Sequence, residues 1–226
     1  CSEITEEVIN KHVAVESFSI ISKREVNGLC EIILNSENNL FSFYCNRKFM
    51  ISGEMFENNT ALTANIIYEI NVKRFKNAIK EINDAVAFTY IPQKIKTDVC
   101  LYMFTDPLCP YCNKIGDDIK ALSDRIGFRV KVLLYTVHGD RGREKCMEAV
   151  CRSMDSKFFN LSEYNSSEWK KKDTDKAFLC KKGEMIIKKT ETVSEKIGID
   201  SVPYFFVDDG NYVNGASIED VEALFN

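Results

Sequence analysis

The stretch FTDPLCPYCNKIG, residues 104–116, places Cys109 and Cys112 three positions apart, with Pro110 and Tyr111 between them. Such a C-x-x-C pair can be half of a zinc site, a structural bridge, or two thiols that react. A structural zinc site needs four ligands, usually from two closely spaced pairs. This chain has a single C-x-x-C, and its two histidines lie far from any matching spacing. Zinc is therefore disfavoured, and no metal is expected.

The residues around the pair indicate a strand over 99–104 followed by a helix over 110–126. Unpaired N–H groups and the macrodipole at a helix start stabilise a thiolate, which predicts a reactive, accessible thiol at Cys109. Pro110 suits the first helical position because it has no N–H to leave unpaired. Cys112, one turn further in, is placed to act as a resolving partner. A plain structural bridge stays possible, but the context favours a dithiol redox site that needs no cofactor beyond the two sulfurs.

Composition narrows the class of protein. The chain has 226 residues, 45% of them hydrophobic, and a formal net charge of −4 with acidic and basic residues mixed along its length. This predicts a folded globular protein without a basic face for nucleic acid. No run approaches the roughly 18 apolar residues of a membrane span. Because the first residue is Cys1 rather than Met, we expect a mature, soluble protein whose signal segment has been removed.

Nine cysteines are many for a cytosolic protein of this size. They favour an oxidising compartment, with buried free thiols as the alternative. Because the count is odd, at least one thiol is expected to be unpaired, modified or blocked, and Cys1 is the natural candidate. A Cys1-Ser2 start also fits a processed bacterial lipoprotein anchored through Cys1, although an arbitrary start to the chain would look the same.

The chain falls into a β-rich part and an α/β part joined by a helix. Short strands are expected over 13–21, 29–34, 40–44 and 49–56, where apolar and β-branched runs alternate with Asn, Ser and Gly. An amphipathic helix is expected over 68–88. Strands are then expected over 99–104, 128–137 and 204–207, and helices over 110–126, 142–154, 156–170, 183–197 and from Ser217. The predicted domains are therefore residues 1–67, a linker helix over 68–88, and residues 89–226.

The remaining cysteines allow one further pairing from the residues alone. If Glu37-Asn38 is a two-residue hairpin turn, Cys30 faces Cys45 directly, and facing Cβ atoms lie about 4.5–5.5 Å apart, near the limit for a disulfide. We therefore expect a possible Cys30–Cys45 bridge. Cys100 is expected to be a buried core thiol, and Cys146 has no evident partner.

A second motif lies near the end of the chain. GIDSVPYFFVDDGNYVNG, residues 198–215, sets Val202-Pro203 before an apolar strand and a tight turn. Together with a C-x-x-C at a helix start, this resembles the thioredoxin fold. The stretches YIPQKIKTDVCLYMFTDPLCPYC, KCMEAVCRSM, SVPYFFVDDGNYVNGAS and NLFSFYCNRKFMISGEMFEN resemble the bacterial periplasmic DsbC/DsbG family of thiol:disulfide interchange proteins.

The resemblance carries specific expectations. It implies a cystatin-like N-terminal dimerisation domain, a linker helix and a C-terminal thioredoxin-fold catalytic domain with a helical insertion, assembled as a V-shaped homodimer. It makes Cys109 the nucleophile, Cys112 the resolving thiol and Pro203 a cis proline beside the site. Val202, Pro203, Pro110 and Tyr111 would then contact substrate. It also implies a structural Cys151–Cys180 disulfide.

Two residues depart from the DsbC pattern. Pro110 precedes Tyr111 inside the motif, as in DsbG, whereas DsbC has Gly-Tyr. Val202 stands where these isomerases usually carry Thr, and Val at this place is more like the oxidase DsbA. Asp106 could assist proton transfer but is expected to order its loop, and Met103 occupies the place of the buried acid of thioredoxin. His138 is expected to be a loop residue, and Trp169, the only tryptophan, a packing anchor.

The expected function is a periplasmic thiol:disulfide isomerase or reductase that acts on misoxidised client proteins. The family resemblance implies a DsbD-like membrane reductant as a second partner. The alternatives are a DsbG-like reductase of oxidised single thiols, a chaperone-type binding dimer, and a DsbA-like oxidase.

Overall fold

The computed structural model describes residues 1–13, 17–46, 48–155 and 161–226. It divides into two compact units, Cys1–Asn71 and Val72–Asn226. Within the described ranges, no helix combines the length and apolar character needed to cross a membrane. Each unit is described below by itself.

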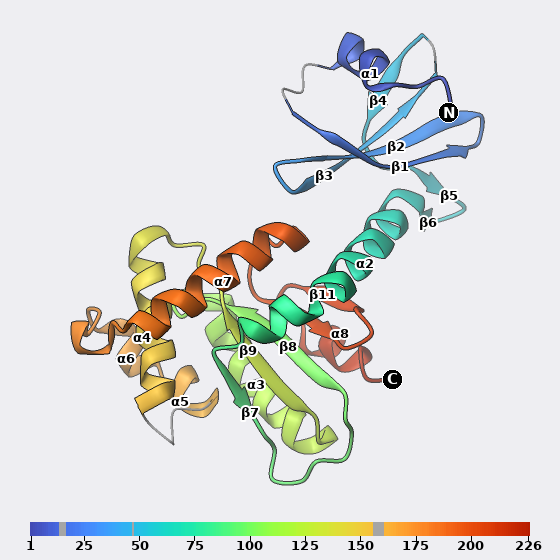
Figure 1. Ribbon diagram of the computed structural model, residues 1–226. Coiled ribbons are helices and arrows are strands. Elements are labelled where there is room, and N and C mark those ends of the chain that lie inside the picture. The colour runs from blue at the N-terminus through green and yellow to red at the C-terminus, as the bar shows by residue number, and fades with distance from the viewer. Residues whose placement is uncertain (14–16, 47, 156–160) are drawn as a thin grey trace. The chain divides into compact units, whose positions relative to one another are not determined.

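The first unit is an antiparallel sheet of four strands in the order β1-β2-β3-β4, followed by a two-stranded hairpin (Figure 1). Helix α1 packs on one face of this sheet, because its buried Ile9 lies in the same core as Ile32, Leu34 and Phe43. The elements are α1 (Glu6–His12), β1 (Ser19–Val26), β2 (Leu29–Ser36), β3 (Asn39–Cys45), β4 (Met50–Ser52), β5 (Phe56–Glu57) and β6 (Thr60–Ala61). The strand expected over 13–21 begins only at Ser19, and residues 14–16 of it lie outside the described part.

The β2–β3 hairpin has the predicted turn. Glu37 and Asn38 adopt left-handed φ values of 49° and 67°, which a two-residue hairpin turn requires. The strand register therefore sets Cys30 opposite Cys45, as expected. The possible Cys30–Cys45 bridge is nevertheless wrong.

The sulfur of Cys30 is bonded to Cys1 instead, and Cys45 is a buried free thiol. Facing positions of a hairpin hold Cβ atoms at the upper limit of disulfide reach, whereas the segment before α1 brings Cys1 directly to Cys30. The expectation that Cys1 carries the unpaired thiol is therefore also wrong.

Helix α2 spans Leu62–Asp84, so it begins six residues before the expected 68 and ends four before 88. Its predicted apolar positions Phe75, Ala78 and Ile82 are fully buried. Phe88, the last residue of the expected helix, instead begins strand β7 (Phe88–Tyr90), because Ala87 donates its N–H to the carbonyl of Val132 and starts a sheet pairing.

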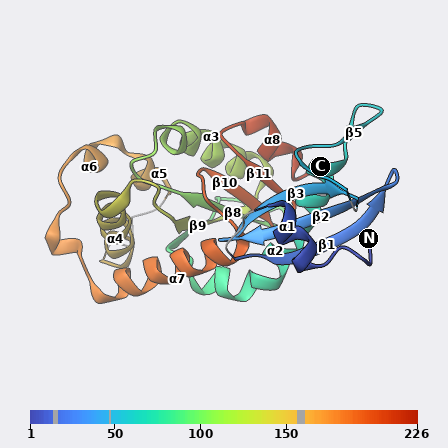
Figure 2. The same ribbon diagram turned by 90° about the horizontal axis from the view of Figure 1, so that it is seen from above.

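The second unit is a five-stranded mixed sheet in the order β11-β10-β8-β9-β7. Its helices cover both faces, with α3 and α8 on one side and α7 with the C-terminal part of α2 on the other (Figure 2). Its further elements are β8 (Cys100–Thr105), α3 (Pro110–Ile126), β9 (Arg129–Leu134), α4 (Gly139–Asp155), α5 (Leu161–Asn165), α6 (Ser167–Lys171), a 3-10 turn (Lys176–Phe178), α7 (Lys181–Ile197), β10 (Tyr204–Val207), β11 (Tyr212–Asn214) and α8 (Ile218–Ala223). The single helix expected over 156–170 is instead α5 and α6, and residues 156–160 lie outside the described part.

Strand β8 is buried on both faces. Leu101 and Met103 pack into the core beneath α3, whereas Tyr102 and Phe104 pack into the core beneath α2 and α7. Because the side chains of β8 pack alternately into two cores, the strand is held at both faces. The loop that follows it therefore leaves the sheet at a fixed point. That loop leads directly to Cys109.

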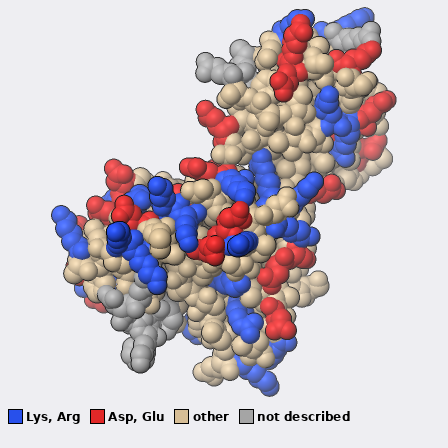
Figure 3. Space-filling view, in the orientation of Figure 1, with Lys and Arg blue, Asp and Glu red and all other residues tan. Residues whose placement is uncertain are grey.

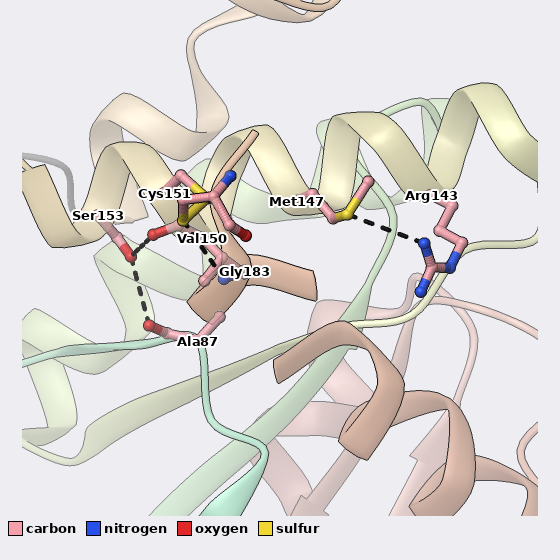
Figure 4. The surroundings of a disulfide bond; sticks show 8 residues. Ala87, Arg143, Met147, Val150, Cys151, Ser153 and Gly183 are labelled. Atoms are coloured by element: carbon pink, nitrogen blue, oxygen red, sulfur yellow. Dashed lines mark hydrogen bonds between the residues drawn. A yellow bond between two sulfur atoms is a disulfide. The ribbon is translucent and has the colours of Figure 1, made fainter. Parts of the chain in front are cut away.

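The helical segments between β9 and α7 are tied by a disulfide between Cys151 of α4 and Cys180, which caps α7 (Figure 4). This is the bridge that the family resemblance implies. Gly183 lies against it: a Cβ on Gly183 would come within 2.5 Å of the Cys151 sulfur. The bridge therefore requires glycine at this position of α7.

Candidate redox site

Cys109 is the N-cap of helix α3. Its backbone is extended (φ −74°, ψ 120°), Pro110 takes the first helical position, and its sulfur accepts a hydrogen bond from the N–H of Cys112 at 3.5 Å. This is the arrangement that the C-x-x-C context predicts. The sulfur therefore faces one of the unpaired N–H groups of the helix start, where negative charge is stabilised.

The expected accessibility of Cys109 is wrong in this structure, because the residue is only 4% exposed. Its thiol donates to the carbonyl of Val202 at 3.7 Å, so the segment before β10 lies against it. The Val202–Pro203 peptide bond is cis, as the resemblance implies. Tyr111, by contrast, is 66% exposed, and Pro110 is exposed beside it.

Cys112 lies one turn into α3 and is completely buried. Burial raises the pKa of its thiol to about 12, although hydrogen bonds from the Asp106 backbone and the Thr105 side chain act in the opposite direction. Cys112 is therefore a neutral thiol at rest, shielded from solvent. Both cysteines are free thiols, so the structure describes the reduced state of the pair.

Asp106 orders the loop between β8 and α3, as expected. Its buried carboxylate accepts from the N–H of Leu108 at 2.7 Å, from the N–H of Val137 at 2.9 Å and from the hydroxyl of Thr136 at 3.0 Å. Its backbone carbonyl accepts from the N–H of Cys109 at 3.1 Å. A single buried carboxylate therefore joins the cysteine loop to the loop after β9.

His138 is a loop residue, as predicted, but it also belongs to this cluster. Its Nδ1 lies 2.8 Å from Asp106 Oδ2, and its side chain is 40% exposed. No sequence signal links these two residues, which lie 32 positions apart.

Three further residues of the site have no sequence signal. Tyr164 of α5 is fully buried and its hydroxyl lies 3.2 Å from that of Thr105. Lys170 of α6 is 4% exposed and donates to the side-chain carbonyl of Asn113, the residue after Cys112. Cys146 of α4 is a fully buried free thiol whose pKa is raised by burial first and then by nearby charges, including those of Asp106 and Cys112.

Cys100 and Trp169 have the structural roles that the sequence predicts. Cys100 is a buried free thiol in the core, as expected. Trp169 is a packing anchor: it packs against the core beneath α3, and its indole N–H donates to the carbonyl of Glu163 at 3.1 Å. Across the described ranges, no group of three or more His, Cys, Asp or Glu is arranged to hold a metal ion. On the face drawn in Figure 3, basic side chains lie among acidic ones.

Comparisons with known proteins agree with this geometry. Residues 84–225 match the family described as thioredoxin-like domain. No curated protein matches the chain significantly. Among solved structures, a linker-deletion variant of Proteus mirabilis ScsC is similar with a TM-score of 0.57 and 20% identity, over 72% of this chain and 84% of that one. The catalytic domain of Proteus mirabilis ScsC is similar with a TM-score of 0.54 and 16% identity, over 68% and 95% of the two chains.

The thiol-disulfide exchange protein α-DsbA2 from Wolbachia pipientis is also similar, with a TM-score of 0.53 and 17% identity, over 73% of this chain and 96% of that one. At identities of 16–20%, these similarities show a shared fold and nothing beyond it. The family match covers most of the chain and contains the cysteine pair, the cis proline and the five-stranded sheet. The chain therefore belongs to the family of thioredoxin-like domains.

Proposed function

We propose that this protein is a thiol:disulfide oxidoreductase that works through Cys109 and Cys112, and that it acts as a disulfide isomerase or reductase on misoxidised proteins of the bacterial periplasm. The observation that carries the proposal is the position of the two thiols. Cys109 caps a helix and touches the Val202 carbonyl, and Cys112 is buried one turn further in.

The two sulfurs have different surroundings, which supports different roles. The Cys109 thiolate would receive the N–H of Cys112 and the field of the α3 N-terminus. It attacks one sulfur of a client disulfide, the client S–S bond breaks, and the second client sulfur leaves as a thiolate. The resulting mixed disulfide either rearranges within the client or is attacked at the Cys109 sulfur by Cys112. The second course closes the Cys109–Cys112 bond and releases the client reduced.

Val202 supports the binding of an extended client segment. In the reduced state its carbonyl accepts the Cys109 thiol proton at 3.7 Å, and that bond is lost when Cys109 ionises. The carbonyl is then available to accept a hydrogen bond from a backbone N–H of the client. Such a bond would hold the client disulfide beside Cys109 whatever the neighbouring client side chains are. The exposed ring of Tyr111 and the exposed Pro110 offer apolar contact next to it.

The first unit supports a homodimer that faces two catalytic units toward one client. Several large apolar side chains of this small unit are exposed, including Ile51 of β4 at 53% and Phe56 of β5 at 63%. Exposed apolar surface of this kind is typical of an interaction site. The two disulfides fit an oxidising compartment such as the periplasm, and a DsbD-like membrane reductant would keep Cys109 reduced. Attachment of a lipid at Cys1 would compete with the Cys1–Cys30 bond for the same sulfur.

The test is recovery of activity by a client enzyme with scrambled disulfides, in a glutathione buffer. Cys109→Ser should abolish turnover, because only that sulfur caps the helix. Cys112→Ala should accumulate mixed disulfides with the client, visible on non-reducing gels, because release is lost. Trapping through Cys112 in the Cys109→Ser variant would reverse the two roles, and full activity of a variant lacking both sulfurs would leave only chaperone-type binding.

A DsbA-like oxidase is the second candidate, and Val202 is the observation that favours it. The two are separated by starting from a reduced client. An oxidase in its disulfide form transfers that bond to the client in one turnover, whereas an isomerase requires the reduced form and acts on a client that is already oxidised.

A further inference from the structure

Lys170 is an unusual residue for the inside of a protein. Lysine is rarely buried without a charged partner, yet Lys170 is 4% exposed. Its Nζ donates to Asn113 Oδ1 and lies 4.3 Å from the centre of the Tyr164 ring. Among the described carboxylates, none makes an ion pair with it. The cation is therefore held by an amide and an aromatic face, and its charge is not neutralised by a contact.

The surroundings of Lys170 and those of the Cys112 sulfur overlap. Asn113, which accepts from Lys170, follows Cys112 on α3. Tyr164, whose ring lies under Nζ, is hydrogen bonded through its hydroxyl to Thr105, and the Thr105 side chain bonds to Cys112. One chain of contacts, through α5 and β8, therefore connects the lysine to the resolving thiol, and its bond to Asn113 holds it against the same turn of α3.

The electrostatics of the two groups are complementary. Burial lowers the pKa of Lys170 to about 8, and a charge on Cys112 acts most strongly in the opposite direction, ahead of Asp117 and Asp106. Coupling between two sites is reciprocal, so an ammonium at Lys170 favours the thiolate of Cys112. Other ionisable groups close to this region are the buried Tyr164 and Cys146, whose pKa values are raised by burial, and the Cys109 thiol.

Two other basic groups of this unit are already paired with carboxylates. Lys145 of α4, which is fully buried, pairs with Glu148 at 2.6 Å, and His138 pairs with Asp106. Met103, at the place of the buried acid of thioredoxin, cannot take a proton and is packed in the core. Lys170 is thus the basic group near Cys112 that no carboxylate contacts within the described residues.

We propose that Lys170 is the proton acceptor and charge partner of Cys112 in the release step of the exchange reaction, an inference that rests on the proposed function. The Cys112 thiol gives its proton to the neutral amine of Lys170. The thiolate so formed attacks the Cys109 sulfur, the Cys109–Cys112 bond forms, and the bond from Cys109 to the client breaks with its electron pair on the client sulfur. Lys170 then returns its proton to solvent, from which the client thiolate is protonated.

The experiment follows the reduced protein with glutathione disulfide by acid quench and mass spectrometry from pH 6 to 9. Attack by Cys109 gives a glutathione adduct, and attack by Cys112 removes it, so the two rate constants are measured separately. Lys170→Met should leave adduct formation unchanged and slow its removal by about 10²-fold at neutral pH, the scale of acid–base assistance, with the pH profile displaced upward. Lys171→Met, at the exposed neighbour, is the matched control and should behave as the parent.

Melting temperatures of the variants are measured alongside, and Lys170→Gln replaces Lys170→Met if the latter does not fold. The inference is overturned if a folded Lys170 variant removes the adduct at the parent rate with the parent pH profile, or if adduct formation slows by the same factor as its removal. Failure of the parent protein to form the adduct at all would instead refute the proposed function.

Discussion

The Lys145–Glu148 pair allows the most quantitative prediction. Both side chains of the pair are only 1% exposed, and Lys145 Nζ lies 2.6 Å from Glu148 Oε2. The same ammonium donates to the carbonyls of Trp169 and Asp173 at 3.1 and 3.2 Å. The other oxygen of Glu148 lies 2.7 Å from the half-buried guanidinium of Arg152. One buried carboxylate thus neutralises two cations and helps to hold the segment that carries Lys170.

Glu148→Gln keeps the size of the side chain and removes its charge, which leaves the Lys145 ammonium buried without a counter-charge. Breaking a buried pair in this way costs about 3–5 kcal/mol. For a chain of this size each kcal/mol lowers the melting temperature by about 2–4 °C, so a fall of about 6–20 °C is expected. Lys145→Met should cost less, because Glu148 keeps Arg152. The double variant should be more stable than the sum of the two single changes predicts.

The assay is urea unfolding of the protein with its two structural disulfides intact and Cys109 and Cys112 reduced, followed by fluorescence of Trp169, the only tryptophan, which packs in this region. Glu144→Gln, at an exposed position of the same helix, is the matched control and should change the free energy of unfolding by less than about 0.5 kcal/mol. The reasoning is refuted if Glu148→Gln unfolds within about 1 kcal/mol of the parent, since a buried, unpaired ammonium would then cost far less than its burial implies.

Four further outcomes are expected. Peptide mapping without reduction should find Cys1 linked to Cys30 and Cys151 linked to Cys180, with Cys45 alkylated only after unfolding; a Cys30–Cys45 peptide would contradict this. In the reduced protein, the stability that neutral Cys112 contributes is complete below pH 9 and is lost as the pH rises from 9 to about 12, because its folded-state pKa is raised; urea midpoints of the parent should therefore fall more steeply over that range than those of Cys112→Ser. Val202→Thr should change the lifetime of mixed disulfides and the redox potential with little loss of stability, and unchanged exchange rates would argue against a role for this side chain. Sedimentation should find the full chain dimeric and a fragment from residue 72 monomeric, and a monomeric full chain would exclude the first unit as a dimerisation domain.

Local signals determined the best predictions. Helix α3 has the predicted bounds of 110 and 126, because Pro110 suits its first position and Gly127, with φ 91°, ends it in the left-handed conformation. Gly127 also lies so close to the backbone of Lys96 that a Cβ would come within 2.7 Å of it. The hairpin register followed in the same way from Glu37-Asn38. Where two or three adjacent residues determine a turn or a helix cap, the sequence alone is sufficient to predict it.

Features that depend on distant partners were not predictable. Strand β7 exists because it pairs with β9, about forty residues along the chain, and it includes Phe88, the last residue of the expected helix. The Cys1–Cys30 bond depends on where the first residues lie, which no periodicity encodes. Lys170 lies in a polar stretch, Ser166 to Lys172, that gives no sign of burial. Its burial becomes evident only once α6 is packed against α3.

The spacing of the two disulfides has a consequence for how the chain acquires them as it is made. Each joins cysteines 29 residues apart, and neither loop encloses Cys109 or Cys112. At about 5–20 residues per second, Cys30 emerges about 1–3 s before Cys45. In a chain that enters an oxidising compartment from its N-terminus, the Cys1–Cys30 bond can therefore close before Cys45 arrives. The Cys109–Cys112 pair is covered last, since Val202, whose carbonyl contacts Cys109, follows it by 93 residues. A catalyst of disulfide exchange would thus form its own two disulfides within successive, non-overlapping stretches of the nascent chain.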